Sequence, residues 1–125
     1  MLADSTSPFI LIVEPNPALQ KPYIFLDSKA FQVIRVNDVL SATQKLEQYQ
    51  ISLVFLSCSF SNKKMLHFLE SLKQASHTKI IPLILVVDLH QPYSIVPGLN
   101  WDQKLALLNS QSSREELSNH LQRLL

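Results

Sequence analysis

The residues that most directly suggest chemistry lie in the stretch ILIVEPNP, residues 10–17. A run of aliphatic residues ends there at a single carboxylate, Glu14, and the next residue is Pro15. Carboxylates that follow the strands of a parallel sheet meet at one edge of the sheet, where a pair of them can hold a metal ion. That ion needs several hard oxygen ligands, usually more than one of them a carboxylate. Glu14 offers one and Pro15 offers none, so the stretch carries half of such a site.

Two further combinations of residues stay open. Asp88 follows another apolar run, and together with Glu14 and Asn16 it could form a makeshift metal site. Two solvated loop acids are the simpler interpretation. Cys58 lies between two serines at the end of an apolar run, but a single thiol without a placed histidine base is more typical of an inert, half-buried residue.

Composition narrows the class of protein. The 125 residues are 46% hydrophobic, enough for one domain with a real core, which we place at 1–125 with residues 1–7 as a flexible tail. A formal net charge of +1 without charged runs predicts no nucleic-acid or membrane partner. The single glycine disfavours a phosphate-binding loop, and the scattered histidines do not have zinc spacing. One cysteine and no signal-peptide pattern predict a cytoplasmic protein.

The elements that would position these residues are strands alternating with helices. Nearly continuous apolar runs are typical of strands buried on both faces of a parallel sheet. Helical spacing over 38–50 places Val39, Ala42, Leu46 and Tyr49 on one face, with Asn37 or Asp38 as the N-cap. Two further helices are expected over 61–76 and from Ser113, whose spacing to Glu116 fits a capping box. The expected strands are 9–13, 31–36, 51–56, 80–87 and 105–108.

The segment 88–103 does not fit a regular helix because proline and glycine recur within it. It also carries large apolar side chains of the kinds enriched at protein interfaces. We expect either a surface for partner contact or side chains that cap the core where a helix is missing. The candidate interaction residues are Tyr93, Ile95, Leu99 and Trp101.

The order and spacing of these elements resemble the receiver domain of two-component response regulators. The resemblance runs from about residue 8 to 125 and is strongest in ILIVEPN, ISLVFLS, IIPLILVVD and SREELSNHLQRLL. It implies a single (βα)₅ domain with a flavodoxin- or CheY-like three-layer α/β sandwich. The sheet would have five parallel strands in the order 2-1-3-4-5, and the fourth helix would be irregular or missing.

The chain departs from that family at the positions that carry its chemistry. Receivers hold Mg²⁺ with two acids after the first strand, positions that fall here on Glu14 and Pro15. Their phosphoacceptor aspartate, at the end of the third strand, falls on Ser57. The hydroxyl residue that ends the fourth strand falls on Val87, and the lysine that ends the fifth falls on Ser110. Lys104 is the alternative for the lysine position if the fifth strand is shifted.

These replacements predict a degenerate site. The Ser57 hydroxyl is neutral near pH 7 and would form an ester in place of a labile acyl phosphate. Val87 cannot hydrogen-bond a phosphoryl oxygen, and Ser110 has no positive charge to balance the negative charge of a phosphoryl group. The resemblance therefore implies a pseudo-receiver without Asp phosphorylation, without a cofactor and without enzymatic activity.

The expected role is signal transduction through contact with partner proteins, alone or as a domain of a larger regulator, with a homodimer as one form. The alternative is a small-molecule sensor with a ligand in the vacated acidic pocket, made less polar by Pro15, Ser57 and Val87. A flavodoxin-like carrier is disfavoured because EPNPALQ lacks the Gly, Ser and Thr of a phosphate loop.

Overall fold

The computed structural model describes residues 8–15, 31–57, 60–75, 81–87, 105–109 and 113–124. These ranges contain five strands and three helices. In chain order they are β1 (Phe9–Val13), β2 (Gln32–Val36), α1 (Val39–Gln48), β3 (Ile51–Ser57), α2 (Asn62–Ala75), β4 (Leu83–Val87), β5 (Leu105–Asn109) and α3 (Arg114–Leu124).

All five strands form one parallel sheet in the order β2-β1-β3-β4-β5. This order agrees with the one implied by the receiver resemblance. The connections between β1 and β2 and between β4 and β5 lie outside the described residues, as does the segment 88–103. The expected irregular or missing fourth helix, and with it the complete (βα)₅ series, therefore stays a prediction.

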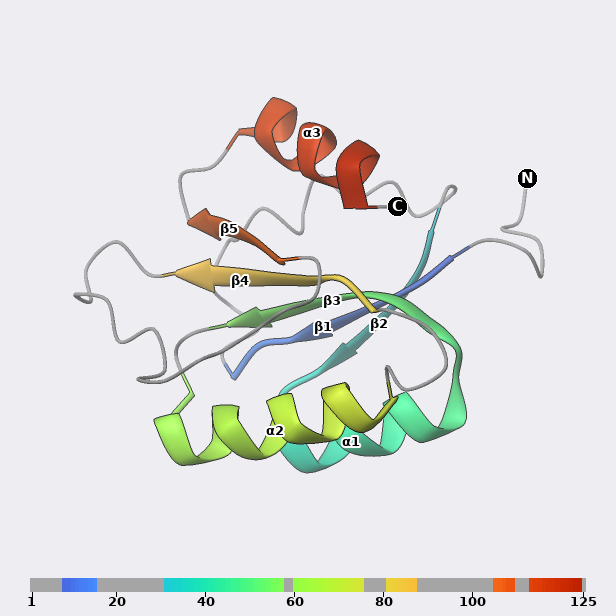
Figure 1. Cartoon of the computed structure of the whole chain (residues 1–125), viewed down its shortest axis with the longest axis vertical. Helices are drawn as coiled ribbons and strands as arrows, with labels where there is room; N and C mark the ends of the chain where they lie inside the picture. The colour runs from blue at the N-terminus through green and yellow to red at the C-terminus, as the bar shows by residue number, and fades with distance from the viewer. Residues whose placement is uncertain are drawn as a thin grey trace.

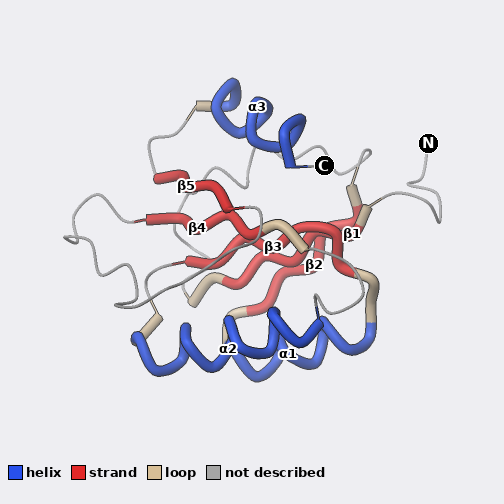
Figure 2. The backbone as a smooth tube through the Cα atoms, viewed as in Figure 1, coloured by secondary structure: helices blue, strands red, loops and turns tan. Residues whose placement is uncertain are grey.

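The sheet is the middle of three layers. Figure 1 shows α1 and α2 side by side on one face of the sheet and α3 on the other. Figure 2, drawn from the same side, shows the strands as one twisted layer between them. Because side chains alternate along a strand, the central strands must be apolar on both faces. This explains the nearly continuous apolar runs in the sequence.

The core divides into two clusters, one for each face. On the α1 and α2 face, Leu11, Val54 and Leu85 of the sheet belong to the same cluster as Met65 and Phe68 of α2. On the α3 face, the alternate strand residues meet the apolar side of α3, where Leu117 and Leu124 are buried. Each helix is thus held to the sheet by an apolar stripe, and burial of such side chains is the main stabilising term of a fold.

The three described helices begin in the same way. Each follows a residue whose side-chain oxygen accepts a hydrogen bond from the backbone N–H three positions later. The pairs are Ser41 N to Asp38 Oδ1 at 2.7 Å, Lys64 N to Ser61 Oγ at 3.3 Å and Glu116 N to Ser113 Oγ at 3.1 Å. These bonds satisfy N–H groups that have no partner inside the helix. The expected cap at Asp38 and the Ser113–Glu116 bond are confirmed.

Asp38 supports a prediction about helix α1. Its carboxylate accepts from both the amide and the hydroxyl of Ser41, and these bonds hold the pKa of Asp38 below its ordinary value of 3.8. Asp38→Ala is expected to lower the free energy of unfolding at pH 7 by about 1 kcal/mol, whereas Asp38→Asn, which keeps a capping oxygen, should lower it much less. Urea unfolding followed by circular dichroism measures both changes.

The same prediction has a pH dependence. The folded carboxyl has a lower pKa than the unfolded one, so its charged form stabilises the fold above pH 3.8, and this contribution is lost as the pH falls through the folded value. The difference between wild type and Asp38→Asn should therefore shrink below about pH 4. An unchanged difference at pH 3 would mean that the charge of Asp38 does not contribute.

One expectation about a helix face is wrong. Helical spacing predicts Tyr49 on the buried face of the first helix, but α1 ends at Gln48 and Tyr49 is its C-cap, in extended conformation and 40% exposed. Its ring packs on Phe9, with centroids 5.1 Å apart, and lies 5.8 Å from the Lys45 ammonium. Because the backbone leaves helical geometry at this residue, Tyr49 contacts the first residue of β1 instead. Leu46 of that predicted face does pack against the core cluster, where it is partly buried.

Candidate functional site

The candidate site lies at the edge of the sheet where the parallel strands end. Val13 of β1 pairs with Leu56 of β3. Glu14 follows Val13 and Ser57 follows Leu56, so the two residues occupy neighbouring positions on adjacent strands. Ser57 in turn pairs with Val86 of β4. Ligands of open α/β sheets bind at this edge because helix N-termini and loops converge there.

Glu14 is buried at this edge. It follows β1 directly, its side chain and backbone are together only 5% exposed, and its amide donates to the Val36 carbonyl oxygen at 3.1 Å. By strand alternation its side chain continues the row of Ile10 and Ile12, on the α3 face. The interpretation of Glu14 as a solvated loop acid is therefore wrong.

Ser57 is the last residue of β3 and is fully buried. It continues the row of Leu53 and Phe55, which places it on the same face of the sheet as Glu14. A neutral hydroxyl fits this enclosed position without the desolvation cost that a carboxylate would carry. A site that transfers phosphoryl groups needs its acceptor atom to be reached by a donor, and the burial of Ser57 opposes this.

The remaining predicted site residues are described only in part. Pro15 follows Glu14 and is half-buried. Val87 ends β4 and pairs with Asn109 of β5, which places its backbone at the same edge. Outside the described residues lie Ser110, its alternative Lys104, the possible cation ligands Asn16 and Asp88, the thiol of Cys58, and the whole predicted interaction surface of Tyr93, Ile95, Leu99 and Trp101.

The described residues at this edge do not by themselves fit a Mg²⁺ ion. Such an ion requires a near-octahedral set of oxygen ligands. Glu14 supplies one carboxylate, Ser57 a neutral hydroxyl and Pro15 no side-chain ligand. Among the residues that the structure describes, no group of three or more His, Cys, Asp or Glu side chains is arranged to hold a metal ion.

One surface feature, a hollow over two helices, was not predicted from the sequence. An open hollow of about 950 Å³ lies over the first halves of α1 and α2. Leucines that the amphipathic pattern left unassigned were the available signal, because Leu40 and Leu66 fall off the buried stripes of their helices. The lining residues are Asp38, Val39, Leu40, Lys63, Lys64, Leu66, His67 and Glu70.

Two smaller features complete the description. His67 of α2 is exposed. His120 of α3 is half-buried, and Arg123 Nη2 lies 3.0 Å from its Nδ1 atom. Within the part of the chain that is described, no helix has the length and apolar character required to cross a membrane.

The fold is that of receiver domains. The chemotaxis response regulator CheY4 of Vibrio cholerae matches with a TM-score of 0.74 at 18% identity, over 96% of this chain and 100% of that one. A CheY-like receiver domain from Methylobacillus flagellatus matches at 0.69 and 18% identity, over 96% and 100%. The receiver domain of a sensor histidine kinase from Pseudomonas aeruginosa, with a magnesium ion in its active site cleft, matches at 0.67 and 19%, over 95% and 98%. No protein-family model and no curated protein matches the sequence.

Proposed function

We propose that this chain is a pseudo-receiver, a receiver-type domain that works in signal transduction by binding partner proteins and without phosphorylation of an aspartate. The observation that carries the proposal is the fully buried Ser57 at the end of β3, the place where receivers have their phosphoacceptor. The receiver fold alone does not fix a function, so the argument depends on the chemistry of this edge.

Three features of the edge support the loss of phosphoryl chemistry. Ser57 has no charge with which to bind Mg²⁺ and no exposed surface for a phosphoryl donor to reach. Pro15 removes both a carboxylate and a backbone donor at the second acid position. Val87, at the end of β4, has no hydroxyl for a phosphoryl oxygen. Each replacement weakens the reaction, and together they remove the groups that would accept, bind and neutralise the phosphate.

A domain of this kind acts by binding rather than by turnover. We infer that it is not an enzyme, has no cofactor, and responds to a partner or to its own concentration in the cytoplasm. The small-molecule alternative is less well supported. Glu14 and Ser57 would be the polar groups of the vacated pocket, and with exposures of 5% and 0% they are closed to a ligand that arrives from solvent.

Phosphorylation chemistry gives the direct test. Incubation of the purified domain with acetyl phosphate and Mg²⁺, read by intact mass, is expected to show no species heavier by about 80 Da, the mass of one phosphoryl group. A receiver domain with its acid set intact, labelled in the same tube, controls for the reagent. An adduct that maps to any residue of this chain would contradict the proposal and name the acceptor.

A further inference from the structure

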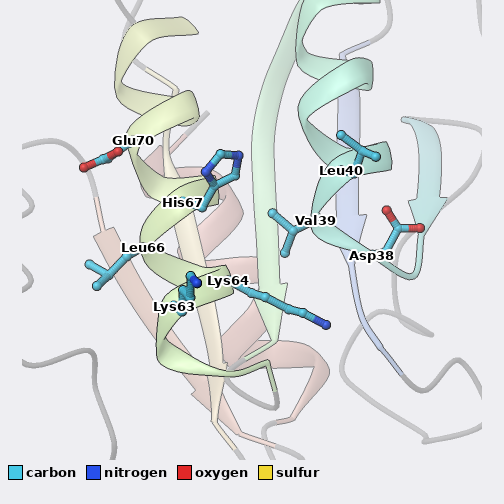
Figure 3. Close-up of a pocket in the computed structure, with 8 residues that line it drawn as sticks. All are labelled: Asp38, Val39, Leu40, Lys63, Lys64, Leu66, His67 and Glu70. Carbon is cyan, nitrogen blue, oxygen red and sulfur yellow. The ribbon is translucent and has the colours of Figure 1, made fainter.

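We draw no further inference here: the strongest candidate, the open hollow over the first halves of α1 and α2 (Figure 3), is lined by lysines and carboxylates alike, and nothing in the described part of the structure shows what covers it.

Discussion

The Ser57→Asp variant is expected to be about 2–4 kcal/mol less stable than wild type at pH 7 and still to take no phosphoryl group. Ser57 is fully buried at the end of β3, and the buried carboxyl of Glu14 follows the neighbouring strand on the same sheet face. A second carboxylate there loses its hydration and is repelled by the first. Phosphoryl transfer stays absent because Pro15 and Val87 still supply no ligand and no hydroxyl.

Urea unfolding and phosphoryl labelling measure the two parts of this prediction. Ser57→Asn is the matched control, because asparagine has nearly the same size as aspartate and no charge. A loss of stability that is equal for the two substitutions would mean that size and not charge is the cause. Restoration of Mg²⁺-dependent labelling by Ser57→Asp alone would mean that Ser57 is the only block to phosphorylation and that Pro15 and Val87 do not prevent it.

The Phe68→Ala variant is expected to lose about 3–5 kcal/mol of folding free energy, a large part of the stability of a domain of this size. Phe68 lies on the sheet side of α2, is fully buried and belongs to the cluster that joins α1 and α2 to the sheet. Its removal leaves a cavity between α2 and the sheet, which the neighbouring side chains can close only in part. Thermal and urea unfolding measure the loss.

The adjacent residue gives the control for this substitution. His67 is exposed on the outer side of the same helix, so His67→Ala should change stability by no more than about 0.5 kcal/mol. A similarly small effect of Phe68→Ala would mean that α2 is not anchored as described. The hollow over α1 and α2 would then not be a fixed surface, because α2 supplies most of its lining.

The sheet could be predicted because its signal is local and strong. FILIV coincides with β1, and ISLVFL and IIPLILVV contain most of β3 and the whole of β4. Strands buried on both faces must be apolar at every position, which leaves few other interpretations of such runs. The caps at Asp38 and Ser113 could be predicted equally well, because a capping side chain accepts from a backbone N–H only three residues further along the chain.

The burial of Glu14 could not be predicted, because it depends on β2 and β3, which lie far from it in sequence. An acid followed by proline is typical of a loop, and only the pairing of neighbouring strands encloses it. The prediction for Tyr49 failed for a related reason. Helical spacing continues through it, but the backbone turns extended at that residue and the ring packs on Phe9 instead.

The hollow over α1 and α2 has a different origin. Helical periodicity assigned Val39 to the core and gave no role to Leu40 or Leu66, because a pattern in one helix does not say which outer surface lies beside it. This hollow exists only because α1 and α2 pack together on one face of the sheet. The charged residues that line it could be read from the sequence, but their position beside exposed leucines could not.

The strand order has a consequence for how the chain folds as it leaves the ribosome. β1 is made first and lies in the interior of the sheet, between β2 and β3, so half of the parallel pairs and both α1 and α2 are complete within the first 75 residues. Of the described helices, only α3 covers the opposite face, with Ile10, Ile12, Leu53 and Phe55, and it is the last of them to be synthesised. Until then this apolar layer lacks the Leu117 and Leu124 side chains that pack on it, and an incompletely covered apolar layer is the kind of surface that chaperones bind.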